Sequence, residues 1–415
     1  MGATGDPGTT FSGIQSRWLS PLQMLELDAC TRCQECVAAC PVVRAGIPDG
    51  AMERIEVWRR AGARSTGLIA RLLKAPSPGS DLPDLFESLF RCTTCGICSV
   101  VCESGISTTP LWESMRAAGR ELGFRYADVE RTAEVIVQMK NPYAMASETR
   151  TAWVPADTQV AGSAPVGFFA GCTIAFRQPE LGRAALRILA RSDTAFCMLG
   201  TRESCCGSFL FRTGSMKEYE CTIRAMIQDF EERGVKTVLF TCAGCLKTVT
   251  ADWPRVYGGP LPFKTMPFSV FMRDLIREKK IRFSSHQPRR VLYHDPCHGG
   301  RHLVHHLGRD WVFEAPRDVL SAIPGLELVE FPENRELASC CGAGGGVKTG
   351  HPDLSQAIAG EKIESIRRIR ADILATTCPF CRRNLNDARI TAGSETEIID
   401  VIELVDRMMD PAPPS

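Results

Sequence analysis

The sequence predicts a multidomain protein of mixed α+β and α/β class, in which an α-helical N-terminal domain precedes two copies of one α/β domain. Three observations support this prediction. Two C-x2-C-x2-C-x3-C runs lie near the N-terminus, with helix-forming segments between and after them. Residues 141–165 lose hydrophobic periodicity. The chain beyond residue 165 repeats its own motifs, and a duplicated domain is the simplest explanation of such a repeat.

These observations also set the domain boundaries. The Gly-rich N-terminus predicts a mobile leader, and the segment NPYAMASETRTAWVPADTQVAGSAP, which gathers Pro, Ser, Thr and Gly, predicts a linker. We therefore expect a flexible leader over residues 1–20, the α-helical domain over 21–140, the linker over 141–165, the two α/β domains over 166–286 and 287–410, and a tail over 411–415.

The composition restricts the function. The chain has 20 cysteines in 415 residues, which indicates either disulfides or metal sites. The N-terminus MGATGDPGTT has neither the basic nor the apolar region of a secretory signal, and no window approaches 18 consecutive apolar residues. We therefore expect a cytoplasmic chain with reduced thiols that are available to metals. A net charge of +1 without a long basic run gives no reason to expect nucleic acid as a partner.

The first cysteine run is CTRCQECVAACP and the second is CTTCGICSVVCE. Both have the spacing of bacterial ferredoxins, in which three closely spaced thiolates bind one [4Fe–4S] cluster and the fourth cysteine binds the other cluster. This spacing predicts two clusters with exchanged fourth ligands. One set is Cys30, Cys33, Cys36 and Cys102, and the other is Cys40, Cys92, Cys95 and Cys98. Glu103 stands where a proline is usual, which loosens that turn without removing a ligand.

The segment between the two runs is too long for a compact ferredoxin. AMERIEVWRRAG and DLPDLFESLF have apolar residues at helical spacing, and residues from about 112 to 140 also have a helical pattern. This arrangement resembles the α-helical ferredoxin domain of succinate dehydrogenase-type iron–sulfur subunits. Structural zinc is the alternative, because CxxC pairs often bind it, but two complete four-cysteine runs favour iron–sulfur clusters.

Three motifs of the first copy recur in the second copy. The pairs are VGFFAGC (166–172) with VLYHDPC (291–297), SCCGSFLFRTGS (204–215) with SCCGAGGGVKTG (339–350), and VLFTCAGCLKTV (238–249) with ILATTCPFCRRNL (373–385). Each copy thus begins with a strand-like run that ends at a cysteine. A second strand-like run follows later in the copy, and a CxxC pair comes directly after it. Strands that alternate with helices predict an α/β sheet, and loops at the strand ends converge in space.

The converging loops gather five cysteines in each copy. The first set is Cys172, Cys205, Cys206, Cys242 and Cys245, and the second is Cys297, Cys340, Cys341, Cys378 and Cys381. A cubane cluster needs only four cysteine ligands, so a fifth indicates a larger group. Cys197 and Cys221 belong to no metal-spacing pattern, and we expect them to be ordinary buried residues.

The spacing of a single cysteine, then CCG, then CxxC resembles the cysteine-rich, or CCG, domain of heterodisulfide reductases. Two ferredoxin runs followed by two such domains resemble the D-type polypeptide of that family, from about Leu25 to Met409. The resemblance implies one or two non-cubane [4Fe–4S] clusters in addition to the two cubanes, with Cys340 and Cys341 on adjacent irons. The implied catalytic residues are Cys297, Cys340, Cys341, Cys378, Cys381 and His298, and the implied cofactor-binding glycines are Gly207, Gly342 and Gly344.

Other interpretations of two of these features remain open. The run GAGGG could form a simple turn beside a cluster, whereas a dinucleotide-binding loop is disfavoured because the G-x-G-x-x-G fingerprint fails at Val347. His298 could supply a proton beside Cys297, or it could only hydrogen-bond a thiolate or the backbone. We favour this second role but keep His298 as the candidate proton donor.

The resemblance implies that the chain is the iron–sulfur component of an oxidoreductase. It would pass electrons from the ferredoxin clusters to the CCG clusters, where a CoM-S-S-CoB-like disulfide, or another thiol or sulfur substrate, is reduced or formed. The main alternative is an electron conduit without its own substrate site, in a flavin dehydrogenase for glycerol-3-phosphate, glycolate or lactate or in a membrane-bound respiratory complex. A zinc-stabilised interaction module is a third possibility.

A partner is expected because the sequence has no flavin motif, quinone-site signature or membrane span. In the family this partner is a cytochrome b-type membrane subunit, which would hold the chain on the inner face of the membrane, or a soluble flavin or hydrogenase module.

Overall fold

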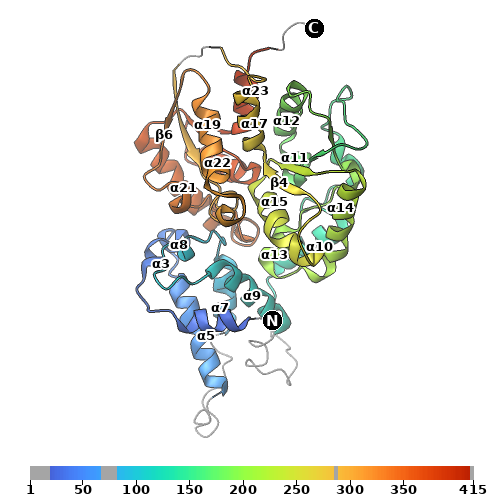
Figure 1. Cartoon of the computed structure of the whole chain (residues 1–415). Coiled ribbons are helices and arrows are strands. Elements are labelled where there is room, and N and C mark those ends of the chain that lie inside the picture. Colours follow the sequence, from blue (N-terminus) through green and yellow to red (C-terminus); the bar gives the residue numbers. More distant parts are fainter. Residues whose placement is uncertain (1–18, 67–81, 285–287, 412–415) are drawn as a thin grey trace. The chain divides into compact units, whose positions relative to one another are not determined.

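The computed structural model describes residues 19–66, 82–284 and 288–411 (Figure 1). The chain forms two compact units. The N-terminal unit contains the chain up to Ala133 and two later segments, Phe209–Ser215 and Gly342–Ile358, whereas the sheet unit contains both four-stranded sheets. The predicted fold class is confirmed. Residues 1–18 of the leader predicted over 1–20, and residues 412–415 of the tail predicted over 411–415, lie outside the described residues.

Within its described residues, the N-terminal unit is helical. Its core is formed by Trp58, Phe86, Leu89, Trp112 and Met115, so the helices predicted from AMERIEVWRRAG and DLPDLFESLF both contribute to it. The helices are α2 (Pro21–Asp28), α3 (Glu35–Ala38), α4 (Pro41–Arg44), α5 (Ala51–Thr66), α7 (Leu82–Arg91), α8 (Ile97–Val100), α9 (Thr108–Glu121) and the first part of α10 (Ala127–Met139), joined by α20 (Val347–Gly350) and most of α13 (Ser208–Thr213).

The helical pattern from about 112 to 140 corresponds to two helices, α9 and α10, and not to one. Gly123 has a φ of +88°, and the amides of Gly123 and Phe124 donate to the carbonyls of Arg120 and Gly119. These bonds are those of a glycine-capped helix end. Phe124 then stacks on Phe86 with ring centroids 4.5 Å apart, and this apolar contact holds the turn in place.

A buried arginine fastens the later segments within the N-terminal unit. Arg116 on α9 is fully buried, and its guanidinium donates to the carbonyls of Leu89, Cys92, Arg212 and Gly345. Burial lowers the pKa of Arg116 to about 10, so the group keeps its charge at neutral pH. Since a buried charge is tolerated only when its donors are satisfied, these four carbonyls explain why an arginine is placed here.

Gly345 is required because two backbones meet at this position. A Cβ on Gly345 would lie 2.3 Å from the carbonyl oxygen of Cys92 and 2.8 Å from the carbonyl carbon of Thr93. The residue also has a φ of +62°, in the left-handed region that favours glycine. The sequence interpretation placed the GAGGG glycines beside a cluster, but the neighbour of Gly345 is the backbone of the second ferredoxin-type run.

Each α/β domain contains a parallel four-stranded sheet with the same strand order. The first sheet has the order β2 (Phe196–Cys197), β1 (Val166–Phe169), β3 (Thr237–Phe240) and β4 (Lys264–Pro267). The second has the order β6 (Leu326–Val329), β5 (Arg289–His294), β7 (Ile373–Thr376) and β8 (Glu397–Asp400). This identity of topology agrees with the duplication seen in the sequence.

Helices connect the parallel strands, as such crossovers require. In the first copy they are α11 (Gly171–Arg177), α12 (Pro179–Arg191), α14 (Glu220–Glu232), α15 (Ala243–Lys247), α16 (Trp253–Tyr257) and α17 (Phe268–Arg277). In the second copy they are α18 (Val304–Leu307), α19 (Ala315–Ser321), α21 (Pro352–Ile369), α22 (Pro379–Thr391) and α23 (Val401–Met408). None of the helices in the described part of the chain is long and apolar enough to cross a membrane.

Short non-α turns complete the described elements. They are η2 (Ser147–Thr151), η3 (Gly200–Arg202), η4 (Lys217–Tyr219), η5 (Thr248–Asp252), η6 (Asp310–Glu314) and η7 (Arg335–Leu337). The first of them, η2, lies in the segment 141–165 that the sequence predicts as a linker. This segment packs on the first copy, because Asn141, Arg150 and Trp153 in it are all buried.

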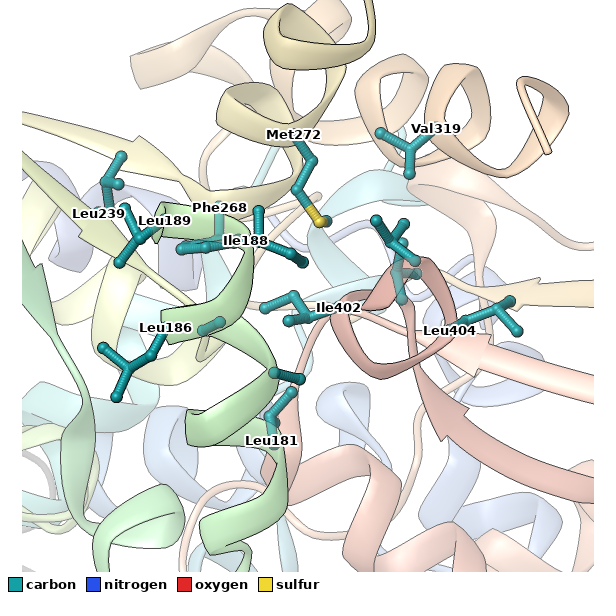
Figure 2. Packing of buried hydrophobic residues seen from close by; sticks show 14 of the residues in the cluster. Leu181, Leu186, Ile188, Leu189, Leu239, Phe268, Met272, Val319, Ile402 and Leu404 are labelled. Atoms are coloured by element: carbon teal, nitrogen blue, oxygen red, sulfur yellow. The ribbon is translucent and has the colours of Figure 1, made fainter. Parts of the chain in front are cut away.

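The two copies share one hydrophobic core. Helix α12 of the first copy packs on α23 of the second, and α17 packs on α19. Since α19 follows β5 as α12 follows β1, and α23 follows β8 as α17 follows β4, these are equivalent contacts made by the two copies. Figure 2 shows residues of this core from both copies: Leu181, Leu186, Ile188, Leu189, Leu239, Phe268, Met272, Val319, Ile402 and Leu404.

We predict that Gly345→Ala destabilises the N-terminal unit. The added methyl group meets the carbonyl of Cys92 and the left-handed backbone is strained, which together should cost about 1–3 kcal/mol. Thermal unfolding should show a lower transition temperature. Gly360→Ala is the matched control, because Gly360 lies within α21 and a Cβ there has nothing within 4 Å. Equal stability of the two variants would contradict the close approach at Gly345.

Candidate metal centres

The first ferredoxin-type set lies near the surface of the N-terminal unit. Cys30, Cys33, Cys36 and Cys102 line one pocket, so the structure brings the fourth cysteine of the second run to the first run. Cys33 is exposed, and the other three are half-buried. Burial raises the pKa of Cys36 to about 11, and the nearby thiols of Cys30 and Cys102 add to this rise.

The second ferredoxin-type set is buried. Its members Cys40, Cys92, Cys95 and Cys98 come from both runs. Burial raises the pKa of Cys40 to about 11 against the opposing charge of Arg54, and the thiols that interact with it are Cys92 and Cys95 of the second run. The structure thus brings together both sets that the sequence predicts, while the role of each thiol as a ligand stays a prediction.

The two runs share a backbone conformation that turns three thiols toward one point. Arg32 and Gln34 have φ angles of +61° and +69°, and Thr94 and Gly96 at the equivalent positions have +52° and +76°. Left-handed backbone is costly for residues other than glycine, and it is kept where surrounding structure requires it. The same two left-handed positions in each C-x2-C-x2-C run indicate that both runs hold their three thiols in the same geometry.

This donor set fits an iron–sulfur cluster. Thiolate is the form that binds metals, yet burial raises the pKa of Cys36 and Cys40 in the metal-free chain. A cation at the centre of each set would offset that cost. Four thiols per set match the ligand number of a [4Fe–4S] cubane.

In the first α/β domain, five thiols gather at the carboxyl edge of the sheet. Cys172 follows β1, and Cys242 follows β3. Thiol–thiol hydrogen bonds connect the set in the order Cys172, Cys205, Cys206, Cys245 and Cys242. The bonds from Cys205 and Cys245 lower the pKa of Cys206 to about 6, which makes it the most acidic thiol of this set.

The second five-cysteine set occupies the same edge of the second sheet. Cys297 follows β5, and Cys378 follows β7. The Sγ atoms of Cys341 and Cys381 lie 3.1 Å apart, and Cys381 also hydrogen-bonds to Cys378. Cys340 is buried beside Cys341 in the chain. The structure therefore brings Cys341, Cys378 and Cys381 together, and the membership of Cys297 and Cys340 in this set stays a prediction.

The two five-cysteine sets meet within the sheet unit. Cys242 of the first set hydrogen-bonds to Cys378 of the second, which holds the pKa of Cys378 well below its usual range. His298 lies at the same junction, because its Nδ1 would be 3.8 Å from a Cβ built on Gly244 of the first set. Among the ten thiols only Cys242 and Cys297 are half-buried, and the other eight are buried.

Two equivalent glycines turn the chain immediately after each cysteine pair. Gly207 has a φ of +83°, and Gly342 has a φ of +84°. Glycine permits this left-handed turn, which lets two adjacent cysteines point into one site. Gly344 has no such φ, and its carbonyl accepts a hydrogen bond from the amide of Val347.

Cationic side chains lie beside both sets, and sequence reasoning missed them. Arg150 is buried, pairs with Glu203 at 3.2 Å and lies 3.6 Å from Sγ of Cys172. Lys362 is buried near the second set and donates to Oγ of Ser339; burial lowers its pKa to about 8. Arg150 falls in the predicted linker and Lys362 in an ordinary helix, so no spacing signal marks either residue.

Comparison with known families identifies the class of protein that these thiol sets define. Residues 26–106 match the 4Fe-4S dicluster domain, and residues 166–250 and 291–386 match the cysteine-rich domain. The chain is thus an iron–sulfur component of an oxidoreductase, with two cubane clusters and further clusters in its cysteine-rich domains. The zinc alternative is therefore set aside.

Full-length relatives narrow the class to one family. The chain is 40% identical over 400 residues to the D-type polypeptide of the dihydromethanophenazine:CoB–CoM heterodisulfide reductase of Methanosarcina acetivorans, covering 94% of this chain and 96% of the relative. The corresponding polypeptide of Methanosarcina barkeri has the same identity and coverage over 401 residues. The chain is also 30% identical to the B-type polypeptide of the fumarate reductase (CoM/CoB) of Methanothermobacter marburgensis, over 92% of this chain and 72% of the relative. The chain belongs to the family of D-type heterodisulfide reductase polypeptides.

We predict that Cys40→Ser removes the cluster of the second run and leaves the cluster of the first run, although Cys40 is part of the first run. Cys102→Ser should have the opposite effect. Iron content and EPR of the reduced protein would measure both, with a loss of about four irons in each variant. Cys221→Ser is the control, because Cys221 belongs to neither set and is exposed; the prediction that it is buried was wrong. Loss of the first-run signal in Cys40→Ser would contradict the exchanged ligands.

Proposed function

We propose that the chain reduces, and in reverse forms, a disulfide at the junction of the two five-cysteine sets. The observation that carries this proposal is the contact between the sets: the free thiols of Cys242 and Cys378 are hydrogen-bonded, and the half-buried Cys242 and Cys297 leave one open side. A disulfide has two sulfurs to release, and two adjacent sulfur-rich sites can each receive one of them.

The reaction needs two electrons and two protons for each disulfide. The S–S bond breaks, each sulfur takes one electron and one proton, and two thiols leave. When bound, the iron–sulfur clusters supply these electrons one at a time. The chain's own contribution is to hold the substrate sulfurs between the first set and the second set, which contains Cys297, Cys340, Cys341, Cys378 and Cys381, and to exclude water from the buried thiols.

His298 is placed to supply a proton. It follows Cys297 directly and is half-buried, and its ring lies next to Gly244 in the CxxC loop of the first set. A proton donor between the two sets can reach either departing sulfur. Histidine is suited to this role because its ordinary pKa is close to neutral pH.

Electrons are proposed to enter at the first ferredoxin-type set. Cys33 in this set is the exposed thiol among the eight of the two runs, so a donor can approach it. The second ferredoxin-type set is buried, and its Cys92 carbonyl shares Arg116 with Gly345, which lies four residues beyond Cys341. We propose that electrons enter at the exposed set, continue to the buried set and then reach the cysteine-rich domains.

The relatives suggest the substrate and partner classes. All three relatives named above carry CoB and CoM in their names, so a CoM-S-S-CoB-like heterodisulfide is the first substrate to test. Because these relatives are subunits, we propose that this chain also works with an electron-donor or acceptor subunit, either a cytochrome b-type membrane protein or a soluble flavin or hydrogenase module. We propose a cytoplasmic position, at the inner membrane face where the partner is of the membrane type.

The deciding experiment starts with iron and acid-labile sulfide in protein purified without oxygen. About 16 irons per chain would mean four occupied four-iron sites. Reduced methyl viologen should then be oxidised when CoM-S-S-CoB or a related disulfide is added. About 8 irons that reconstitution does not increase, together with no disulfide turnover, would favour an electron conduit without its own substrate site.

Cys341→Ser should abolish disulfide reduction and leave the EPR signals of both ferredoxin-type clusters intact. Cys341 is buried and its Sγ contacts Sγ of Cys381, so its loss opens the second set. Viologen oxidation and EPR measure the two effects. Cys197→Ser is the control, because the Cys197 thiol is buried on β2 outside every set. Unchanged activity of Cys341→Ser would remove the second set from the reaction.

His298→Gln should lower the turnover rate by about 100-fold or more without loss of iron, because glutamine cannot deliver a proton. The pH–rate profile should also lose the limb that the histidine provides. His306→Gln, in the same segment but exposed, should behave as the unchanged protein does. A normal turnover rate and pH–rate profile in His298→Gln would mean that His298 donates no proton to the substrate and only hydrogen-bonds a thiolate or the backbone.

A further inference from the structure

A second histidine in the second cysteine-rich domain has an unusual environment. His294 is the last residue of β5 and is 1% exposed. Neither Nδ1 nor Nε2 has a hydrogen-bond partner among the described residues. A ring nitrogen of His294 and the Sγ atoms of Cys341 and Cys381 all lie within 4.8 Å of one another. The ring therefore faces the second five-cysteine set from the end of a central strand.

Burial without a partner is costly for a ring that carries an N–H group. Polar groups in protein interiors are almost always hydrogen-bonded, and an exception calls for an explanation. The charged neighbours do not provide one. The carboxylate of Asp295 is engaged by both terminal nitrogens of Arg317, and the ammonium of Lys362 is directed to Ser339. What remains next to the ring is the space among the thiols.

The first copy has no imidazole at this position. Val166–Phe169 and Val291–His294 align strand for strand, so Phe169 is the counterpart of His294. Phe169 is satisfied by apolar contacts, with its ring centroid 5.3 Å from that of Phe240 and 6.4 Å from that of Trp253. The two sets therefore share five cysteines each but differ in the one polar group at the strand end.

We propose that the His294 ring donates its N–H to a sulfur of the iron–sulfur group held by the second set, and that this bond raises the reduction potential of that group. A donor near sulfur stabilises the more negative, reduced form, and hydrogen bonds to sulfur are among the features that set cluster potentials. The first set has only Phe169 there. The bond would thus favour the reduced form of the group at the second set, where Cys297 and His298 lie.

The inference deepens the proposed function, because it rests on a cluster being bound by the second set. His294 is a positioning and tuning residue in this proposal. It acts on electrons through sulfur and transfers no proton to the substrate, which separates its role from that of His298.

The test uses protein purified without oxygen and labelled with 15N-histidine. Pulsed EPR of the reduced, unsubstituted protein should show a weak nitrogen coupling on one cluster that changes with the isotope. A coupling as strong as that of an iron-bound nitrogen, or no coupling, would overturn the hydrogen bond. This measurement needs no substitution, so it decides the question even where a variant does not fold.

Substitutions then test the potential. His294→Phe reproduces the first copy and should keep all iron, lose the nitrogen coupling and shift one cysteine-rich cluster to a more negative potential in a redox titration followed by EPR. His294→Gln retains a donor and should restore much of the potential without the histidine coupling. His305→Gln is the control, because His305 is exposed in the same domain. Unchanged potentials in His294→Phe would overturn the proposal.

The iron count separates this failure from failure of the proposed function. If the unsubstituted protein holds only about 8 irons after reconstitution, both the disulfide site and the role of His294 fall. If it holds about 16 irons and reduces disulfides, but His294→Phe has the same spectra and potentials, only the role of His294 falls.

Discussion

The organisation of the N-terminal unit depends on one buried guanidinium. Arg116 donates to carbonyls at three distant points of the chain: the second ferredoxin-type run, the segment after the first cysteine pair and the segment after the second. A buried charge that loses its partners destabilises the protein. Each of these carbonyls is therefore held in place by its hydrogen bond to the guanidinium. Because Gly345 and Cys92 share this guanidinium, the position of the glycine run is fixed relative to a ferredoxin cysteine. The absence of a side chain at Gly345 then allows the two backbones to touch.

Duplication explains the sheet unit, and small departures from it explain how two similar sites can differ. The copies have the same strand order, equivalent helix contacts and five thiols at the same sheet edge. Each copy also buries a carboxylate–arginine pair near its first cysteine. In the first copy the carboxylate is Glu203, which accepts hydrogen bonds from the amides of Ala170 and Gly171. In the second copy it is Asp295, which stands at the chain position equivalent to Ala170 and accepts a hydrogen bond from Arg317. The scaffold is thus shared by the two copies while its polar contacts are rearranged.

The sequence predicted those features that short spacings encode. The fold class, the family and the cluster-binding domains were confirmed, because C-x2-C-x2-C-x3-C and CCG patterns constrain a few residues in a known geometry. Contacts between distant residues were not predictable. The partner of Arg116 at Gly345 lies 229 residues away, and Arg150 reaches Cys172 from a segment that lacks periodicity. The helical pattern from about 112 to 140 was confirmed, but the break between its two helices was not predicted, because it depends on a glycine cap at Gly123.

Burial of the thiols follows a pattern that fits an enclosed electron path. Exposed or half-buried cysteines occur in the first ferredoxin-type set and again at Cys242 and Cys297, whereas the second ferredoxin-type set and the remaining eight cysteine-rich thiols are buried. Low-potential electrons are lost when water and oxidants reach them, so accessible sulfur is useful only where a partner or a substrate must approach. The distribution is the one expected if, as proposed, electrons enter at the first ferredoxin-type set and a substrate approaches Cys242 and Cys297. For the same reason, the junction of Cys242 and Cys378, where a half-buried thiol meets a buried one, is the place where we propose that the disulfide reacts.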